Sequence, residues 1–415
     1  MIDTSLVLSD KDHLKRELAK KNYYSDSIDK LETVLLEIRS LKTALNDYGR
    51  RRNELSRDTS VSTEEKRTLR HNISGTEKKL KAAEEYAESL LFDIPNLPDA
   101  DAPVGKDETD NHVIQESQDY YMCKAGDPSP HWDIAANLDI LDTELAGKIA
   151  GARFGLFKGA GARLLRALVN YCMALHENKY FEILPPHLVS TQSLVYSGHY
   201  PKFSEEQYKC ASDDLWLIPT AEVPMTAAFA GTVFHEGSLP MRCMGYTLAF
   251  RREVGSTGRD TRGLQRIHEF HKVELLKIAE PSTVQAELDD LLEDCLKIIK
   301  DLKLQYRIVD LCTGDMGDKY ARCYDIEVYS PGIKKWLEVS SVGHFSDYQA
   351  RRAKIEYISG NGKKKYAYTL NGSGVATARV WAAIIETYQQ PDGSVKVPEA
   401  LVSLMGCDKI KNSAL

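Results

Sequence analysis

Two runs of apolar residues at three- and four-residue spacing fill most of the first hundred positions, and they constrain the fold more than any other feature. The first run is Leu31, Val34, Ile38, Leu41, Leu45, Tyr48 and Leu55. The second run is Leu69, Ile73, Thr76, Leu80, Ala83, Ala87 and Leu90. Heptad-like spacing of this kind predicts two helices that pack through a shared apolar seam.

The boundaries of these two helices can also be predicted. Ser62 and Glu65 have the spacing of a capping box, which starts the second helix. The polar stretch from Ser56 to Ser60 reads as the link between the helices. We therefore expect an antiparallel coiled-coil hairpin over about residues 27–92, roughly 40 Å long at 1.5 Å per residue.

A hairpin of two helices is too thin to hold a catalytic pocket, so it predicts a lever or a contact surface. Basic residues gather toward its tip, among them Arg50, Arg51, Arg52, Arg57, Arg67 and Arg70. Clustered arginines suit a nucleic-acid phosphate backbone. A solvated polar helix face is the alternative interpretation, and the residues of the hairpin alone do not decide between the two.

A change in composition marks a domain boundary near residue 100. Pro95 and Pro98 end the helical segment, and a polar, acidic link follows from Asp99 to Asn111. We expect an N-terminal helical domain over residues 1–100 and a larger domain over residues 101–415.

The larger domain reads as α+β. Short β-rich runs alternate with helical ones, without regular βαβ repeats, which predicts an antiparallel sheet flanked by helices. The expected strands are 215–218, 246–250, 267–275, 306–309, 324–329 and 337–341, and a helix is expected over 282–302.

Bulk composition excludes several classes of protein. A net charge of −7 argues against indiscriminate nucleic-acid binding, although it leaves room for a local basic surface. The chain has no run of about 18 apolar residues, and its start lacks the features of a secretory signal. Its 8 cysteines are scattered. They therefore predict reduced thiols in a cytoplasmic protein, with no disulfide frame and no structural zinc.

The segment from Phe250 to Glu274 is the most informative for function. Its basic residues are Arg251, Arg252, Arg259, Arg262, Arg266 and Lys272, and three glycines lie among them. Both ends read as strand, so we expect a hairpin with a long loop. Arginine forks match phosphate oxygens, and glycine allows close approach of the backbone, so the loop predicts a polyanionic ligand.

Alternation along the second strand of this hairpin should place His268, Phe270, Lys272 and Glu274 on one face. Phe270 and Glu274 would then stand about 13 Å apart, which is the span of a nucleotide carrying a small cationic group. A surface hairpin with a solvated charged loop is the alternative.

Three further segments carry candidate chemistry. Thr220 and Glu222 follow a short apolar strand and could present a hydroxyl and a carboxylate to a pocket, although the same pattern also caps helices. In Glu338-Val339-Ser340-Ser341, a carboxylate lies beside hydroxyls, the oxygen ligands that Mg²⁺ takes. Alternation puts Glu338 and Ser340 on one face and Ser341 on the other, unless the strand ends there.

The third segment is Asn371-Gly372-Ser373-Gly374, which we expect to lead into a buried, apolar helix over residues 375–388. Arg379 falls within that helix. A buried arginine needs an anionic partner, which could be an internal carboxylate or the triphosphate of a bound nucleotide.

These segments, taken in chain order, resemble the seryl-tRNA synthetases, a family of class II aminoacyl-tRNA synthetases. The likeness covers nearly the whole chain. It also includes the segments 94–98, 151–154, 184–186, 201–203, 312–317 and 347–352. The resemblance implies a class II antiparallel sheet of six or seven strands with a coiled-coil arm. It also implies a homodimer built through residues 161–186, and ATP-dependent, AMP-forming charging of serine tRNA with L-serine.

The resemblance further implies roles for individual residues. Arg251, Glu274 and Arg379 correspond to catalytic residues. The serine pocket corresponds to Thr220, Ala221, Glu222, Arg251, Glu274, Asn371 and Ser373. ATP contacts correspond to Arg251, Arg252, Glu253, Arg266, Ile267, Phe270, Glu338, Val339, Ser340, Ser341 and Arg379. Glu338 and Ser341 correspond to Mg²⁺ ligands, and the arginines of the arm to tRNA contacts.

The chain departs from the family pattern in three places. Val342-Gly343-His344-Phe345 replaces a Cys-Ser-Asn-like run, and Tyr196 to Tyr200 replaces Gly-Thr-Gly-Gln-Leu. Ala378 stands where a glycine commonly precedes the arginine. These changes keep two alternatives open. One is a paralogue that adenylates serine or another small amino acid for a specialised tRNA or a non-tRNA acceptor. The other is a catalytically silent RNA-binding paralogue.

Overall fold

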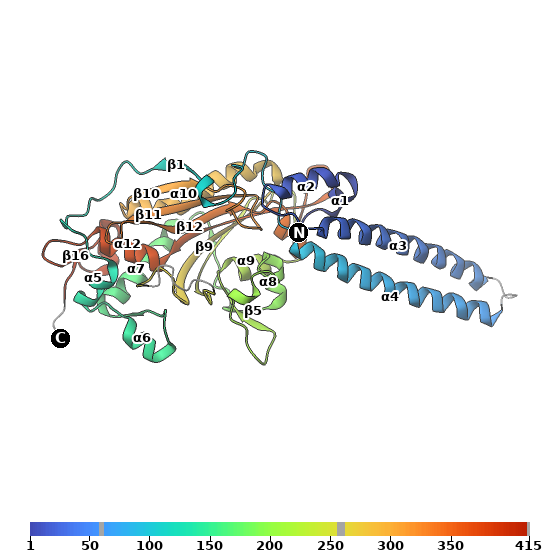
Figure 1. Ribbon diagram of the computed structural model, residues 1–415, viewed down its shortest axis with the longest axis horizontal. Coiled ribbons are helices and arrows are strands. Elements are labelled where there is room, and N and C mark those ends of the chain that lie inside the picture. The colour runs from blue at the N-terminus through green and yellow to red at the C-terminus, as the bar shows by residue number, and fades with distance from the viewer. Residues whose placement is uncertain (58–61, 255–261, 413–415) are drawn as a thin grey trace. The chain divides into compact units, whose positions relative to one another are not determined.

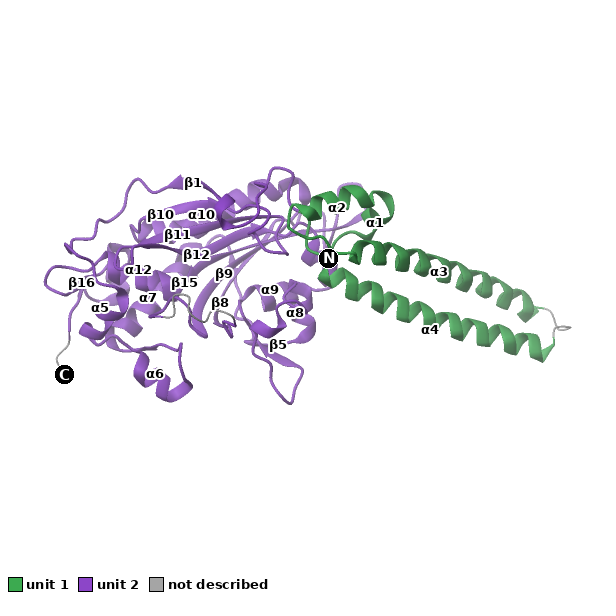
Figure 2. Cartoon of the chain, viewed as in Figure 1, with its two compact units in different colours: residues 1–97 green, residues 98–415 purple. Residues whose placement is uncertain are grey.

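The computed structural model describes residues 1–57, 62–254 and 262–412. The chain divides into two compact units, Met1–Leu97 and Pro98–Leu415, which Figure 2 shows in different colours. Within the described ranges, no helix has the length and hydropathy needed to cross a bilayer. All eight cysteines are free thiols.

The first unit is entirely helical. Its helices are α1 (Thr4–Ser9), α2 (Lys11–Ala19), α3 (Ser27–Arg57) and α4 (Thr63–Asp93). The buried core of this unit lies where α1 and α2 pack on one end of the α3–α4 pair. It contains Val7, Leu14, Leu18, Ile28, Leu31, Val34, Ile38, Ala83, Ala87 and Leu91. This packing anchors the base of the pair, because those side chains are withdrawn from water there.

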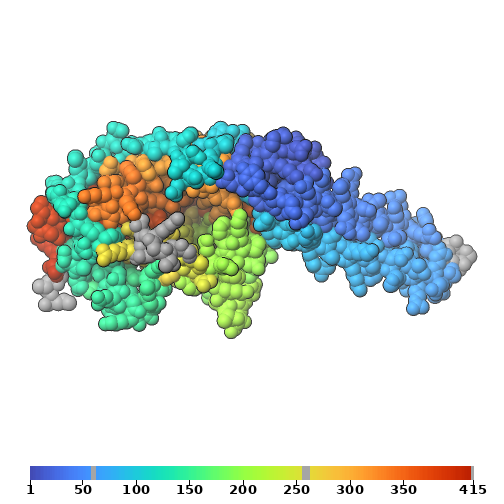
Figure 3. Space-filling model, in the orientation of Figure 1, coloured from blue at the N-terminus to red at the C-terminus, as the bar shows by residue number. Residues whose placement is uncertain are grey.

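Helices α3 and α4 form the expected antiparallel hairpin, with 31 residues in each helix. The ion pairs Lys42–Glu84 and Arg51–Glu65, each 2.8 Å, connect the two helices in antiparallel register. The Ser62 side chain accepts a hydrogen bond from the Glu65 backbone N–H, which confirms this half of the capping box. In the space-filling view the pair is a narrow rod (Figure 3).

The link between these helices differs from the expectation at one end. Ser56 and Arg57 belong to the last turn of α3, so the helix runs two residues further than predicted. Asp58, Thr59 and Ser60 lie outside the described residues.

The second unit is built on an eight-stranded sheet in the order β1-β10-β11-β12-β15-β9-β8-β4 (Figure 1). The seven strands from β1 to β8 in this order pair antiparallel with one another, as predicted, and the two-residue strand β4 pairs in parallel with β8 at one edge. The strands are β1 (His112–Glu116), β4 (Phe181–Glu182), β8 (Met241–Phe250), β9 (Glu269–Ala279), β10 (Tyr306–Asp310), β11 (Arg322–Ser330), β12 (Lys335–His344) and β15 (Tyr368–Ala376).

The helices that pack on the sheet include α7 (Gly159–His176), α10 (Val284–Asp301) and α12 (Thr377–Thr387), and α5 (His131–Leu138) packs on α12. Smaller helices are α6 (Thr143–Ala150), α8 (Thr191–Ser197), α9 (Glu222–Ala228), α11 (Tyr348–Ala353) and α13 (Val402–Met405). Short strands β2 (Leu141–Asp142) and β3 (Leu156–Phe157) pair with each other. So do β5 (Leu188–Ser190) with β6 (Leu215–Leu217), and β16 (Val395–Lys396) with β17 (Lys409–Ile410). Strand β13 (Glu356–Ile358) pairs with β7 (Val233–Phe234) and β14 (Lys364–Tyr366).

The boundary between β15 and α12 corrects the sequence analysis. The glycine-rich segment from Asn371 to Gly374 lies within β15, and the helix begins at Thr377 rather than at residue 375. Strand β15 pairs with β9 along its whole length, and this long-range ladder extends the strand through the glycines. A Cβ on Gly372 would lie 2.6 Å from Cys295 Sγ of α10, and one on Gly374 would lie 3.0 Å from Cys172 Sγ of α7. The glycines therefore let α7 and α10 pack closely on this face of the strand.

Candidate active site

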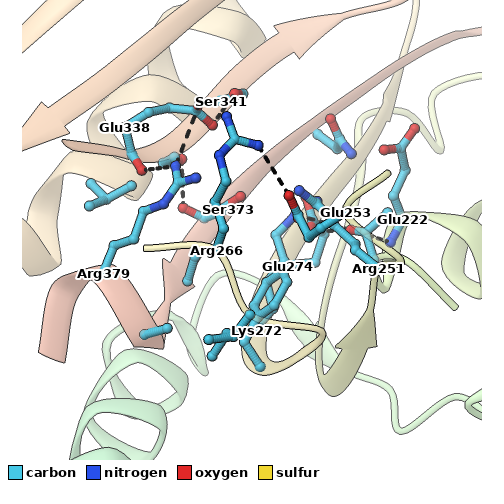
Figure 4. A pocket seen from close by; sticks show the side chains of 18 of the residues that line it. Glu222, Arg251, Glu253, Arg266, Lys272, Glu274, Glu338, Ser341, Ser373 and Arg379 are labelled. Atoms are coloured by element: carbon cyan, nitrogen blue, oxygen red, sulfur yellow. Dashed lines mark hydrogen bonds and ion pairs between the residues drawn. The ribbon is translucent and has the colours of Figure 1, made fainter. Parts of the chain in front are cut away.

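One cavity in the second unit lies on β9, β12 and β15, and it gathers most of the predicted site residues (Figure 4). Its lining includes Thr220, Glu222, Arg251, Glu253, Arg266, Ile267, Phe270, Glu274, Glu338, Val339, Ser340, Ser341, Asn371, Ser373 and Arg379. The empty space measures about 1000 Å³, mouth included. Of the residues predicted to bind serine or ATP, Ala221 and Arg252 are not among the described lining residues.

Strand β9 and Arg251, the residue that follows β8, line one side of the cavity. The strands pair from Met241–Ile278 to Phe250–Glu269, so Phe270, Lys272 and Glu274 project together from β9 into the cavity. The Arg251 guanidinium carbon lies 5.3 Å from the centroid of the Phe270 ring, and Arg251 Nε donates to the Pro219 carbonyl at 3.3 Å. Arg251 is thereby fixed beside the predicted adenine platform.

One residue of the hairpin, His268, lies outside this arrangement. His268 was predicted on the face of Phe270, but it precedes the regular strand and does not appear in the described lining. Its Nδ1 lies 2.9 Å from the Arg251 carbonyl oxygen, and its ring packs against Phe154. The alternation failed because β9 begins only at Glu269. Arg259 lies outside the described residues.

One end of the cavity is rich in groups suited to phosphate. Figure 4 shows Arg379, Glu338 and Ser341 together there, whereas Arg251 and Glu222 lie toward the other end. Arg379 donates to the Glu338 carbonyl at 2.6 Å and to the Gln265 carbonyl at 3.2 Å, and the Glu338 carboxylate is 3.7 Å away. Arg379 was expected to be buried, but 29% of its side chain is exposed, because it lies in the first turn of α12.

The prediction that Ser341 faces away from Glu338 was wrong. A register shift between β11 and β12 leaves Val339 without a direct partner, since Glu327 pairs with Glu338 while Ile326 already pairs with Ser340. This β-bulge resets the alternation, so the Ser341 hydroxyl donates to Glu338 Oε1 at 3.3 Å. The two predicted metal ligands therefore meet on one face of a strand that continues to His344.

Asp325, which sequence analysis missed, lies opposite Ser341 on β11. Its Oδ1 is buried without a hydrogen-bond partner in the described part of the chain. Burial raises the pKa of Asp325 well above its usual range, and the Glu338 carboxylate adds to that shift. Two carboxylates and a hydroxyl thus converge where a cation would relieve their repulsion, although the described residues contain no group of three or more His, Cys, Asp or Glu side chains placed to hold a metal ion.

The other end of the cavity carries buried carboxylates. Thr220 Oγ1 donates to Glu274 Oε2 at 2.8 Å, and Lys272 Nζ lies 2.5 Å from the same oxygen and 3.0 Å from Thr220 Oγ1. Burial raises the pKa of Glu274 above its usual value, and Lys272 opposes that shift. Ala221, predicted in the serine pocket, is instead fully buried in the core beside Met225.

Strand β15 contributes the polar wall between these ends. Asn371 and Ser373 line the cavity, while Gly372 and Gly374 face the helices on the opposite side. Asn371 Oδ1 is buried and has no hydrogen-bond partner among the described residues. An orphaned amide oxygen at a cavity wall marks a position where a ligand donor would be favourable.

Sequence analysis also missed a group of polar residues around Glu222. Lys319 Nζ lies 2.7 Å from both carboxylate oxygens of Glu222, and Gln349 Nε2 donates to Oε1 at 2.7 Å. Lys319 lies 97 positions from Glu222 in sequence, and no sequence motif points to it. Gln349 belongs to the segment 347–352 that resembles the family, but the resemblance assigns it no role.

The segments that depart from the family pattern reach the cavity only in part. His199 and Ala378 line it. Val342 and Phe345 are fully buried instead, and His344 Nε2 contacts Asp99 Oδ2 at 2.7 Å. The departure from the family pattern at Val342–Phe345 therefore alters side chains that pack around the site, and none of them is in the described lining of the cavity.

The arginines predicted to contact tRNA lie in the first unit, on α3 and α4, and all six are exposed: Arg50, Arg51, Arg52, Arg57, Arg67 and Arg70. Arg51 shares an ion pair with Glu65, and Arg50 lies 3.4 Å from Asp47.

Arginines, an aromatic ring and carboxylates that line one cavity on an antiparallel sheet are typical of a class II aminoacyl-tRNA synthetase core. Residues 205–388 match the family model of the tRNA synthetase class II core domain (G, H, P, S and T). The chain is 44% identical to a serine–tRNA ligase of Gloeothece citriformis over 94% of this chain and 93% of that protein. It is 40% identical to one of Fervidobacterium nodosum over 99% of both chains. The chain belongs to the serine–tRNA ligase family.

Solved structures agree with this assignment. The seryl-tRNA synthetase of Pyrococcus horikoshii complexed with ATP superposes with a TM-score of 0.92 at 28% identity, covering 100% of both chains. The cytoplasmic serine–tRNA ligase of Naegleria fowleri in complex with AMP gives a TM-score of 0.88 at 25% identity, covering 100% of this chain and 99% of that one.

Proposed function

We propose that this protein activates L-serine with ATP to form seryl-adenylate and then transfers the seryl group to the 3′ end of serine tRNA. The observation that carries the proposal is the single cavity that joins a phosphate-suited end to a carboxylate-rich end. Relatives crystallised with ATP or AMP support a nucleotide in this cavity. Family membership favours this function over both alternative hypotheses.

The first step needs alignment and charge neutralisation rather than a protein nucleophile. A serine carboxylate oxygen attacks the α-phosphorus of ATP, the bond from that phosphorus to the bridging oxygen breaks, and pyrophosphate leaves. Negative charge grows on the phosphoryl oxygens during this step. We assign Arg251 to the α-phosphate and Arg379 to the γ-phosphate, with the adenine on Phe270, because all three side chains line the cavity and the two arginines lie toward opposite ends of it (Figure 4).

Glu253 and Arg266 complete the nucleotide end in this proposal. Arg266 NH1 lies 3.1 Å from Glu253 Oε2, and Arg153 NH1 donates to the Glu253 carbonyl at 3.2 Å. This pair would frame the adenine and phosphates.

In the second step a 3′-terminal hydroxyl of tRNA attacks the adenylate carbonyl, and AMP leaves.

The amino-acid end is assigned to Thr220, Glu222, Glu274, Asn371 and Ser373. Selecting serine over alanine is feasible there, because polar groups that bond the serine hydroxyl would be left unpaired by alanine. The orphaned Asn371 Oδ1 is such a group.

The test is exchange of labelled pyrophosphate into ATP with each of the twenty amino acids, followed by charging of tRNA with labelled serine. We expect serine to support both reactions. A preference for another amino acid would favour the specialised paralogue. Loss of ATP binding in calorimetry would favour the silent paralogue.

Magnesium is proposed as the cofactor, held by Glu338 and Ser341. Their oxygens meet at 3.3 Å beside Asp325 Oδ1, which has no hydrogen-bond partner in the part of the chain that the structure describes, and this fits the oxygen-rich donor set that Mg²⁺ prefers. Bound there, Mg²⁺ would supply positive charge to the ATP phosphates. In this proposal Ser341 orients the Glu338 carboxylate through its hydrogen bond.

Replacing Glu338 by glutamine should therefore raise the Mg²⁺ concentration needed for half-maximal pyrophosphate exchange by roughly tenfold or more, since a ligating carboxylate loses its charge. The matched control is Glu327→Gln, which changes the register partner of Glu338 on β11. Glu327 pairs with Arg307 and should leave the Mg²⁺ titration unchanged. Superimposable titrations for Glu338→Gln and the unaltered protein would contradict the proposed site.

We also propose that the protein is a homodimer through the segment 161–186. Apolar side chains are exposed on and beside the edge strand β4, with Phe181 49% and Leu184 76% exposed. Analytical ultracentrifugation should show a dimer, and Leu184→Asp should shift the population toward monomer. A monomer at all concentrations in the unaltered protein would contradict this interface.

The free cysteines support a cytoplasmic location.

The α3–α4 pair is proposed as the tRNA-binding element. Its exposed arginines suit phosphates, and the pair carries no catalytic side chain in this assignment.

A further inference from the structure

The Lys319 ammonium is surrounded by groups that bind cations, at the amino-acid end of the cavity. It contacts both Glu222 oxygens at 2.7 Å and His199 Nε2 at 3.2 Å. The rings of Phe345 and Tyr320 lie 5.3 Å and 5.6 Å from the same nitrogen. A carboxylate, a ring nitrogen and two aromatic faces are the groups that would hold a substrate ammonium, but here they hold an internal one.

The partners around this ammonium are themselves fixed. An ammonium only donates, so His199 Nε2 accepts from Lys319, and Nδ1–H donates to Ser197 Oγ at 2.9 Å. Gln349 donates to Glu222 through Nε2, while its Oε1 accepts from Thr369 Oγ1 at 2.7 Å. The hydrogen bonds leave this group little freedom to rearrange.

The charges in the group balance each other near neutral pH. Burial alone would raise the pKa of Glu222, but Lys319 more than offsets this and holds that pKa at about 2. Burial lowers the pKa of His199 to about 3, with Lys319 adding to the shift, so its imidazole is neutral. Glu222 therefore carries a negative charge that Lys319 neutralises.

Both carboxylates at this end already hold an internal ammonium. Both oxygens of Glu222 are engaged by Lys319, and Gln349 adds a second bond to Oε1. Glu274 accepts from Thr220 and lies 2.5 Å from the Lys272 ammonium, in each case through Oε2. A substrate ammonium would therefore meet a like charge at either carboxylate, that of Lys319 at Glu222 and that of Lys272 at Glu274.

We propose that Lys319 is a specificity-determining residue, whose ammonium competes with the substrate ammonium for Glu222. This inference rests on the proposed function, because it concerns the amino-acid end of the same cavity. Its consequence is a pocket that selects weakly for a substrate ammonium. An analogue in which a hydroxyl replaces that ammonium should then bind nearly as well as serine.

The experiment compares L-serine with L-glycerate, which carries a hydroxyl in place of the ammonium group. In full-length protein, Lys319→Met should lower the KM for serine in pyrophosphate exchange about tenfold and change kcat less than threefold. The ratio of the glycerate inhibition constant to the serine KM should rise by about tenfold or more, because Glu222 becomes available to the ammonium. The matched control is Lys202→Met, which removes a half-exposed lysine paired with Asp318 and should change neither quantity.

A second variant covers the case in which Lys319→Met alone is too unstable, since it leaves Glu222 buried without its charge partner. The double variant Lys319→Met with Glu222→Gln replaces the ion pair with neutral groups. We expect its ratio of the glycerate inhibition constant to the serine KM to stay within threefold of the ratio in the unaltered protein, because the neutralised pair discriminates little between an ammonium and a hydroxyl. A tenfold or larger fall of that ratio in the double variant would overturn the proposal, as would a higher serine KM or an unchanged glycerate ratio in Lys319→Met. Absence of serine-dependent exchange in the unaltered protein would instead refute the proposed function.

Discussion

Arg251→Ala should lower serine-dependent pyrophosphate exchange by roughly a thousandfold or more, the size of effect seen when a transition-state charge contact is removed. Arg251 follows β8 directly, and its backbone N–H donates to the His268 carbonyl at 2.9 Å. Its Nε is held by the Pro219 carbonyl, and its guanidinium lies beside Phe270. The charge is thus positioned before ATP binds, which makes its loss costly in the transition state.

The variant Arg251→Lys separates the contribution of the positive charge from that of the planar guanidinium group. Lysine keeps the positive charge but loses the planar fork that binds two phosphate oxygens, so we expect a loss of roughly a hundredfold. Thermal unfolding should change little for either variant, because the side chain is exposed in the cavity.

The matched control is the neighbouring arginine. Arg252 is exposed, donates from NH1 to the Glu205 carbonyl at 3.0 Å, and is not among the described lining residues of the cavity. Arg252→Ala should therefore keep exchange within about threefold of the unaltered protein. Equal losses at the two positions would show that general positive charge, rather than the placement of Arg251, supports adenylate formation.

Shortening the α3–α4 pair should lower tRNA charging by roughly a hundredfold while pyrophosphate exchange stays within about twofold. The structure defines a deletion of residues 46–79, closed by a short Gly-Ser linker. The retained ion pair Lys42–Glu84 holds the register. The buried residues Ile28, Leu31, Val34 and Ile38 on α3, with Ala83, Ala87 and Leu91 on α4, all remain.

Two measurements separate phosphate contacts from other effects of the deletion. Changing Arg50, Arg51 and Arg52 together to glutamine in the full-length protein should weaken tRNA binding and flatten its dependence on salt. The same positions changed to lysine should retain most of the binding, because phosphate contacts need charge more than sequence-specific geometry. Full charging by the shortened protein would refute a role for the pair in tRNA recognition.

Much of the fold follows from patterns that act over short distances. Helices α3 and α4 were predictable because apolar spacing and the Ser62 cap operate within a few turns. Strands β8 and β9 were predictable because alternation repeats every two residues. The end of the strand Tyr368–Ala376 was wrongly predicted as the start of a helix, because its glycines have no strand preference of their own.

The candidate site was predictable where its residues share one element. Phe270, Lys272 and Glu274 reached the cavity together because they alternate along β9. His268 did not, because the regular strand begins only after it. The identity of the remaining site residues came from their resemblance to a family, and geometry has since excluded Ala221 and Arg252 from the described lining.

The amino-acid sequence by itself determined the helical hairpin, the antiparallel sheet and the chemical types of side chain available to a nucleotide site, since all of these follow from local periodicity and composition. Tertiary structure alone decided that a bulge at Val339 brings Ser341 to Glu338, and that Lys319 neutralises Glu222 across 97 positions of chain. Such contacts depend on which strands pair, in what register, and on which distant charges are buried together. No short window of sequence carries that information, because the forces that fix it act only once the chain is folded.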